Sequence, residues 1–379
     1  MAEPVVLQTL ADLVSIPSVN SAYPDGVGEA AVVEYLRAFC AQHGIEHWQD
    51  EVLPGRPNFF ARVPGRDAAK RLVFEAHTDT VSALGMTIDP FKGEIRDGAL
   101  YGRGACDTKA GLAAMLCALA DVAASGSAAC EIWLAATIDE EHAFRGVAKL
   151  CEDFRADGAV VAEPTGLRAV IATKGVLRWP IRVLGRAAHS AKPHLGLNAI
   201  TEMARLLLDL ERENERLAAN PHPLLGPATH NVGLIQGGRQ VNFVPDECTI
   251  QIDRRLIPGE NIADVLAGYR RRLDELAQLF PGFRAEMGDT LLEDYPLETA
   301  ADAAIVQAAR RTLEQRGLDT QPIGVPYGSD ASKLARIGIP SIVLGPGSID
   351  QAHAAVEFVD CGQVETAQAI YREIMEVFQ

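Results

Sequence analysis

The chain has 379 residues, of which 48% are hydrophobic and 23% are charged, so we expect a sizeable core rather than overall disorder. Its 35 basic residues against 51 acidic residues give a formal net charge of −16. A chain this acidic lacks the basic face that nucleic acid requires, and anionic lipid does not attract it. Composition therefore predicts a protein with no nucleic-acid partner and no membrane partner.

The N-terminal segment MAEPVVLQTLADLVSIPSVN lacks the basic region, the long apolar region and the cleavage site of a secretory signal. No apolar run in the sequence is long enough to span a bilayer. The seven cysteines are scattered and never spaced as CxxC, which argues against a disulfide framework or a thiolate zinc site. These features predict a cytoplasmic protein with reduced thiols.

The first part of the chain alternates between helical and strand patterns. Helical patterns cover Ala30–His43 and Lys109–Ala124. Short apolar strands are expected over Arg71–Ala76, Cys130–Thr137 and Asp157–Val161. This alternation predicts the α/β class, with a mixed, mostly parallel sheet flanked by helices.

The pattern changes near Lys174 and returns to the earlier rhythm near residue 288. Between these points the expected order is strand–helix–strand–strand–helix–strand, as in a ferredoxin-like α+β module. Its expected elements are Val176–Leu184, Leu197–Ala218, Asn231–Ile235, Glu247–Leu256 and Ile262–Leu279. Beyond it we expect a helix at Ala300–Gln315, a strand at Ser341–Leu344 and a helix at Val364–Phe378. We therefore predict a module at 174–287 inserted into a larger domain formed by 1–173 and 288–379.

Polar residues gather where the expected strands end, which is where open α/β sheets bind their ligands. His77 and Asp79 follow the strand at 71–76 and share one face of an extended segment. This pair suits a metal-binding imidazole with an orienting carboxylate, or simply a histidine that is satisfied at a loop start. Asp107 stands in a glycine-rich turn, where it either caps the next helix or bridges two metals.

Further acids and a histidine fall at comparable junctions. Asp139, Glu140 and Glu141 follow the strand at 130–137, either as a solvated loop or as a metal ligand beside a general base. Glu163 ends another strand, and His353 lies in a loop near the C-terminus, where histidines are usually polar surface. Carboxylates and imidazoles without thiolate suit zinc, cobalt or manganese. As a set, these residues predict a hydrolytic site with two divalent metals.

Seven motifs resemble one enzyme family, and they occur in the family's order: EAHTDTV, YGRGACDTKAG, TIDEEHAFRG, VVAEPTG, RAAHSAKP, NFVPDECTIQIDRRLIPGE and LGPGSIDQAH. The resemblance runs from LVSIPSVN to HAAVEF, so it covers nearly the whole chain. The family comprises the dinuclear zinc amidohydrolases and exopeptidases, which include acetylornithine deacetylase, succinyl-diaminopimelate desuccinylase, aminoacylase and glutamate carboxypeptidase.

The resemblance implies a role for each residue of the expected site. One metal would be bound by His77, Asp107 and Glu163, and the other by Asp107, Glu141 and His353, with Asp107 bridging. Asp79 would orient His77, and Glu140 would be the general base that activates a hydroxide bridging the metals. The Asp107–Thr108 peptide bond would be cis.

The same resemblance implies that the inserted module is a lid and the dimerisation domain of a homodimer. His189 would reach into the partner's site and polarise the scissile carbonyl, although the sequence also fits a surface histidine. Asn242 and Arg255 match positions that hold the substrate's carboxylate, although Arg255 fits a solvated strand position equally well.

The LGPGSIDQAH segment most resembles acetylornithine deacetylases. We therefore expect a metal-dependent hydrolase that cleaves the amide bond of small N-acyl amino acids. A zinc carboxypeptidase, a dipeptidase and a succinyl-diaminopimelate desuccinylase-like enzyme are alternatives within the family. Ala143, Phe144 and Arg145 depart from its usual pattern after the glutamate pair. A serine or cysteine hydrolase and a non-catalytic scaffold are the rival interpretations, but the chain has no G-x-S-x-G.

Overall fold

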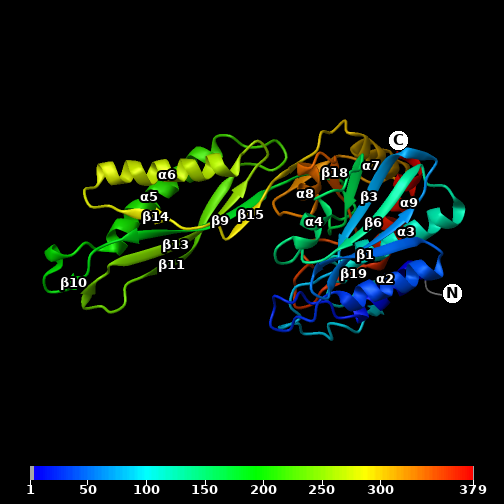
Figure 1. Ribbon diagram of the computed structural model, residues 1–379, viewed down its shortest axis with the longest axis horizontal. Coiled ribbons are helices and arrows are strands. Elements are labelled where there is room, and N and C mark those ends of the chain that lie inside the picture. Colours follow the sequence, from blue (N-terminus) through cyan, green and yellow to red (C-terminus); the bar gives the residue numbers. More distant parts are fainter. Residues whose placement is uncertain (1–3, 379) are drawn as a thin grey trace. The chain divides into compact units, whose positions relative to one another are not determined.

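The computed structural model describes residues 4–378, which form two compact units (Figure 1). The first unit comprises residues 4–171, 299–323 and 329–378, and the second comprises 172–298 and 324–328. The segment 174–287 falls inside the second unit, which also takes residues 288–298. Each unit has a hydrophobic core of its own.

The first unit combines seven helices of the described chain with a central sheet. Its helices are α1 (Val5–Ser15), α2 (Ala30–Gln42), α3 (Lys109–Ser125), α4 (Arg145–Leu150), α7 (Ala304–Gln315), α8 (Ala331–Arg336) and α9 (Cys361–Val377). Its main strands are β1 (Glu46–Leu53), β2 (Arg56–Val63), β3 (Asp67–His77), β6 (Cys130–Thr137), β7 (Gly158–Val161), β8 (Val170–Thr173) and β18 (Ser341–Val343). A smaller sheet contains β4 (Glu94–Arg96), β5 (Ala99–Tyr101) and β19 (Phe358–Asp360), and β17 (Ile323–Val325) pairs with β8.

The central sheet has the order β1-β2-β6-β3-β7-β18-β8-β16, in which the short terminal strand β16 (Leu297–Glu298) pairs with β8. The four middle strands β6, β3, β7 and β18 are parallel, whereas the pairs at either side are antiparallel. This arrangement confirms the predicted mixed sheet flanked by helices. Because the middle strands are parallel, their carboxyl ends lie at one edge of the sheet.

Apolar residues on both faces explain why the middle strands are buried. Leu72, Val73 and Phe74 are consecutive in β3, and each has 0% of its surface exposed. A continuous apolar run of this kind is typical of a parallel strand that is covered on both faces. Helix α3 packs against α9 and the sheet, and its alanine-rich sequence allows a close approach. No helix among residues 4–378 combines the length and the apolar character that crossing a bilayer requires.

The second unit is an antiparallel sheet with two long helices. Its helices are α5 (Ala199–Ala218) and α6 (Ile262–Leu279), with a short 3-10 turn η1 at Pro193–Leu195. Its strands are β9 (Gly175–Leu184), β10 (Ala188–His189), β11 (Thr229–Gly237), β12 (Phe243–Val244), β13 (Glu247–Leu256), β14 (Ala285–Met287), β15 (Leu292–Asp294) and β16 (Leu297–Glu298). The main sheet has the order β11-β13-β9-β14, which is the strand order of a ferredoxin-like module.

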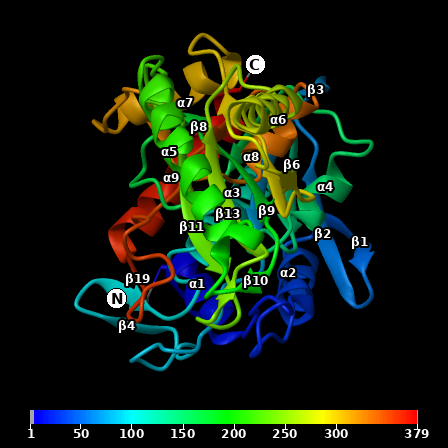
Figure 2. The same ribbon diagram turned by 90° about the vertical axis from the view of Figure 1, so that its left-hand side faces the viewer.

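Strand β9 shows how the sequence gives this sheet one buried face. Trp179 and Ile181 are fully buried, whereas Arg178 and Arg182, which alternate with them, are exposed. Alternation with a period of two is typical of an antiparallel strand with one solvated face. Both long helices cover the same buried face, as the two views show (Figure 1 and Figure 2).

The separate core of the second unit predicts a stability effect. Ile250 of β13 is fully buried there, so Ile250→Ala should lower the free energy of unfolding by about 2–5 kcal/mol through lost burial and a cavity. Val241→Ala removes the same kind of side chain from a residue that is 100% exposed, and it should change the free energy by less than about 0.5 kcal/mol. Urea denaturation measures both, and equal losses would contradict the core assignment.

Candidate active site

The site residues are brought together by the parallel strands. Strand β3 ends at His77, and β6 ends at Thr137, shortly before Glu140. Strand β7 ends at Val161, shortly before Glu163. These strands are neighbours in the sheet, so the polar residues that follow them meet at its carboxyl edge.

Asp107 lies at the centre of this cluster, in the turn that precedes α3. Its Oδ1 is 3.1 Å from Nε2 of His77, and its Oδ2 is 3.3 Å from Nε2 of His353. Nε2 of His353 is also 3.1 Å from Oε1 of Glu141, and Nε2 of His77 is 4.0 Å from Oε1 of Glu163. The two oxygens of one carboxylate therefore face two different imidazoles.

Among the described residues, three sets of side chains could each hold a metal ion. Within each set, the possible ligand atoms lie within 4.8 Å of one another. The sets are His77, Asp107 and Glu163; Asp107, Glu141 and His353; and His77, Glu140 and Glu141. The first two are the sets that the resemblance implied, and Asp107 belongs to both. The third places Glu140 beside a member of each of the other two. The roles of these residues stay predictions, but their proximity is a property of the structure.

Burial and neighbouring charge act strongly on these groups. Burial raises the pKa of Glu163 well above its usual range, and the carboxylate of Asp107 raises it further. Burial also raises the pKa of Glu140, although the imidazole of His77 opposes this shift. Hydrogen bonds with two carboxylates raise the pKa of His353 to about 10. The three sets contain four carboxyl groups and two imidazoles, so the acids outnumber the groups that can carry positive charge.

This excess of buried acids fits a site for divalent cations, because buried carboxylates require compensating positive charge. The donors are carboxylate oxygens and imidazole nitrogens, which zinc, cobalt and manganese accept. Cys106 adjoins Asp107, but burial raises the pKa of its thiol, and its Sγ donates a hydrogen bond to the carbonyl oxygen of Ser348. The donor set therefore contains no thiolate.

Asp79 holds both His77 and the loop that carries Glu140 and Glu141. Oδ1 of Asp79 is 3.6 Å from Nδ1 of His77, while the Asp79 carbonyl oxygen lies closer to that nitrogen, at 3.0 Å. The carboxylate also accepts hydrogen bonds from the backbone N–H groups of Glu140 and Glu141, each at 3.1 Å. The Asp79 carboxylate therefore lies closer to the backbone N–H groups of the loop than to the imidazole of His77.

Glu357 is a further residue of the site that the sequence did not reveal. Its side chain is fully buried, and its Oε1 accepts the backbone N–H groups of Cys106 at 2.9 Å and of Asp107 at 3.1 Å. Arg103 donates to its other oxygen at 2.5 Å. Glu357 therefore fixes the turn that presents Asp107. The Asp107–Thr108 peptide bond in this turn is cis, as the resemblance implied.

Two other buried acids behind the site, Glu75 and Asp330, were also not singled out as site residues. The hydroxyl of Thr137 lies between them, 2.6 Å from Oε1 of Glu75 and 3.2 Å from Oδ2 of Asp330. Glu75 lies two residues before His77 in β3 and is the first residue of the EAHTDTV motif. Asp330 directly precedes α8.

Gly345 lets the loop after β18 pass beside Glu163. A Cβ atom at this position would lie 2.5 Å from the carbonyl oxygen of Glu163, a distance that requires the backbone to move. Thr165 reinforces the same contact, because its hydroxyl lies 3.2 Å from the Gly345 carbonyl oxygen. The glycine of the LGPG motif is therefore required by close backbone approach.

The remaining predicted site residues lie in the second unit. His189 of β10 is exposed, and its Nδ1 accepts a hydrogen bond from the backbone N–H of Ala191. The exposed Asn242 is adjacent to it, because the carbonyl oxygen of Asn242 accepts the N–H of Ser190 at 3.0 Å. Arg255 is half-buried on β13 and donates to Asp253 at 2.8 Å. His189 and Asn242 therefore lie close together in the second unit, whereas Arg255 lies on a different strand, β13.

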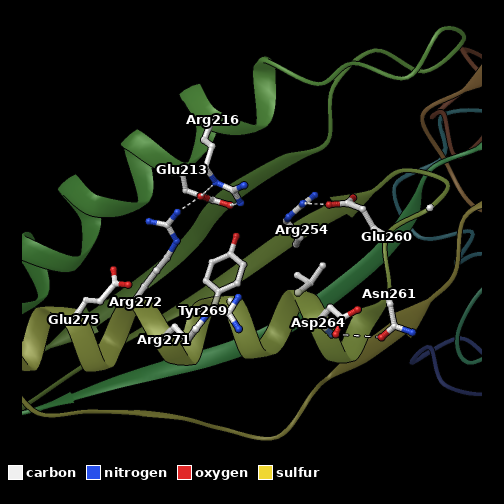
Figure 3. Close-up of a pocket in the computed structure, with 13 residues that line it drawn as sticks. Glu213, Arg216, Arg254, Glu260, Asn261, Asp264, Tyr269, Arg271, Arg272 and Glu275 are labelled. Atoms are coloured by element: carbon white, nitrogen blue, oxygen red, sulfur yellow. Dashed lines mark hydrogen bonds and ion pairs between the residues drawn. The ribbon is translucent and has the colours of Figure 1, made fainter.

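The second unit also contains a cavity of about 420 Å³ between α5, α6 and the end of β13 (Figure 3). Three of the arginines that line it are paired with acids rather than free for a ligand. Arg254 donates to Glu260 at 2.5 Å, and both Arg216 and Arg272 contact Glu213. Four arginines and four acids line the cavity, so it offers no net charge to an anion or a cation.

Phe144 and Arg145, the two bulky departures from the family pattern, have partners within the first unit. The Lys333 ammonium lies 3.3 Å from the centre of the Phe144 ring, which is a cation–π contact. Arg145 turns back to Asp139 and donates to it through Nε at 2.5 Å and Nη2 at 3.0 Å. Arg145 is therefore part of the loop's support.

Comparisons with known proteins agree with this geometry. The profile of Peptidase family M20/M25/M40 matches residues 73–377. An acetylornithine deacetylase from Myxococcus xanthus is 31% identical over 97% of this chain and 96% of its own length. The crystal structure of aminopeptidase PepT from Bacillus cereus has a TM-score of 0.81 at 23% identity, over 99% of this chain and 98% of that one. A dinuclear metal-binding peptidase from Bacillus subtilis has a TM-score of 0.76 at 16% identity, over 98% and 97%.

The shared position of Asp107 predicts the metal content of two variants. Asp107→Ala should lose both metal ions, because each of the two sets loses a ligand, whereas Glu163→Ala should lose one, because Glu163 belongs to one of these sets only. Elemental analysis after dialysis against zinc measures the bound metal, and circular dichroism checks that both variants are folded. Two equivalents of zinc in Asp107→Ala would show that it is not a bridging ligand.

Proposed function

The chain belongs to Peptidase family M20/M25/M40, and from this premise we propose that it is a metal-dependent deacylase of N-acyl amino acids. It is a hydrolase that acts on amides or peptides. The observation that carries the proposal is the buried acid cluster in which Asp107 faces both His77 and His353. The favoured substrate is N-acetylornithine, because a deacetylase of that compound is similar to this chain over nearly its whole length.

The proposed metal ligands are the two sets that share Asp107. His77 and Glu163 would complete one set, and Glu141 and His353 the other. Divalent ions at such a site polarise a carbonyl and lower the pKa of water. Zinc is the proposed metal, with cobalt or manganese as alternatives, because the ligands are oxygen and nitrogen atoms.

Glu140 is the proposed general base. It lies beside both sets but belongs to neither of the two that share Asp107. In the reaction its carboxylate would take a proton from the attacking water and later deliver it to the nitrogen of the departing amine. A buried carboxyl whose pKa is raised suits both steps, because it accepts a proton readily and remains able to donate it.

The second unit would supply the groups that recognise the substrate. His189 is proposed to stabilise the negative charge that develops on the carbonyl oxygen, and Asn242 and Arg255 to hold the substrate's carboxylate. Exposed histidine and asparagine side chains remain available for such contacts. Arg255 already pairs with Asp253, so a substrate carboxylate would compete with that ion pair.

The homodimer is also part of the proposal. Strand β11 is at the edge of its sheet, and Leu234 and Ile235 on it are 55% and 53% exposed. An unpaired strand edge with exposed aliphatic side chains suits pairing with a second copy of the chain. The second unit would then be the dimerisation domain, as the resemblance implied.

A hydrolysis screen tests the substrate class. The purified chain is supplied with zinc, cobalt or manganese and assayed on N-acetylornithine, N-succinyl-diaminopimelate and a set of dipeptides. We expect N-acetylornithine to give the highest kcat/KM and a chelator such as phenanthroline to abolish the activity. Preference for a dipeptide would indicate the peptidase alternative, and activity that resists the chelator would contradict the metal-dependent mechanism.

The general-base assignment predicts different losses for two adjacent glutamates. Glu140→Ala should retain two equivalents of zinc but lose about 10²–10⁴-fold in kcat, because proton transfer is lost while the metal ligands remain. Glu141→Ala should lose one equivalent of zinc, since Glu141 belongs to a ligand set. Elemental analysis and steady-state kinetics measure both effects. The assignments are reversed if Glu140→Ala loses zinc and Glu141→Ala keeps it.

The role of His189 across the dimer predicts recovery of activity in mixed dimers. His189→Ala and Glu140→Ala should each be nearly inactive, because each of their sites lacks one group. A mixed dimer would contain one site with both defects and one intact site, so mixing the two variants should restore part of the activity. Subunit exchange is verified with differently tagged chains. No recovery after exchange would disprove the trans role, as would a fully active monomer.

A further inference from the structure

A chain of buried polar side chains lies behind the Glu140–Glu141 loop. Asn20, Asp79 and Asp139 are 0–1% exposed, and they come from three separate segments of the first unit. Asp139 also contacts Arg56, whose guanidinium is paired with the fully buried Glu29 at 2.5 and 2.7 Å. A buried polar network of this kind is stable only when each member finds its partners.

Asn20 connects the two carboxylates of this network. Its Nδ2 lies 2.7 Å from Oδ2 of Asp79 and 3.0 Å from Oδ1 of Asp139. An amide nitrogen carries two hydrogens, so both donors of Asn20 are used on carboxylates. Its Oδ1 accepts the backbone N–H of Ala22 at 3.0 Å, which fixes the orientation of the amide.

Each carboxylate, in turn, controls the loop that carries the two glutamates. Asp79 accepts the backbone N–H groups of Glu140 and Glu141. Asp139 has a positive φ of 72°, a conformation that non-glycine residues rarely adopt. Its side chain is held by Asn20, Arg56 and Arg145, so the surrounding contacts compensate for this unfavourable backbone geometry.

We propose that Asn20 is a positioning residue of the active site, whose amide fastens Asp139 to Asp79 and thereby sets the Glu140–Glu141 loop. Without the amide, two buried carboxylates would face each other with no donor between them, and one or both would turn away. A rotation of Asp79 would release the N–H groups of the two glutamates. A displacement of about 1 Å in a catalytic group is enough to cost about 10²-fold in rate.

This inference rests on the proposed function, because it assumes that the loop carries a general base and a metal ligand. Arg145, which departs from the family pattern, would then be the outer support of Asp139. The side-chain hydrogen bonds of Asn20 go to Asp79, Asp139 and Ala22, none of which is a proposed metal ligand or the proposed general base.

The test compares Asn20→Ala with a control of similar structural cost. Thr299→Val removes the hydroxyl that donates to Ser341 at 2.5 Å, at the amino end of β18 and thus at the end of the strand opposite to the site. Both variants lose buried hydrogen bonds, so both should melt at a lower temperature than the wild type. Only Asn20→Ala should lose about 10–100-fold in kcat, with KM changed by less than about threefold.

Binding of Co²⁺ gives a second readout that does not depend on turnover. The metal-free chain is titrated with Co²⁺, and the absorption of the bound cobalt gives a dissociation constant for each equivalent. Asn20→Ala should bind one equivalent about 10–100-fold more weakly than the wild type. Kinetics are measured on whichever amide the wild-type chain hydrolyses, so a wrong substrate assignment does not affect the comparison. If the wild type binds no Co²⁺, the proposed function itself fails.

If Asn20→Ala does not fold, Asn20→Ser tests the same positioning role. Its hydroxyl has a single hydrogen and can serve only one of the two carboxylates, so a reduced kcat with an unchanged KM is again expected. Variants at Asn20 whose kcat and Co²⁺ affinity equal those of Thr299→Val would overturn the inference, because Asn20 would then contribute to stability alone.

Discussion

The rest of the site depends on one carboxylate, that of Asp107, which is shared between two imidazoles. Its two oxygens face His77 and His353, and further acids surround the same space. Carboxylates concentrated in a buried site repel one another and lose their hydration, so such a cluster persists only with compensating positive charge. The imidazoles supply part of that charge, and a pair of divalent cations would supply the rest.

The fold achieves this concentration by using loops that are fixed from behind. Parallel strands bring the acids to one edge of the sheet, but a loop alone would not hold them at ligand distances. Glu357 fastens the turn before α3, and Asp79 fastens the loop after β6, in both cases through backbone N–H groups. Fully buried side chains thus position the partly exposed ones, which is the usual relation between supporting residues and ligands.

The sequence predicted the elements that carry strong periodicity and the residues that belong to contiguous motifs. Strand β6 has the predicted bounds, and the end of β3 at His77 lies one residue beyond the predicted strand. Asn20 and Glu357 lie in the segments LVSIPSVN and HAAVEF, but their roles could not be recognised there. Most of their partners lie 59 to 254 residues away and are set by tertiary packing. The segment 288–298 was likewise placed with the larger domain, whereas β15 in it pairs with β9 of the second unit.

The acid cluster should hydrolyse amides only when it holds divalent metal. The most direct measurement follows hydrolysis of N-acetylornithine while zinc is returned to the chelator-treated chain, with bound zinc determined by elemental analysis on the same samples. The account predicts no hydrolysis without bound zinc and full hydrolysis when two equivalents are bound. Full hydrolysis by a chain that contains no metal would contradict it.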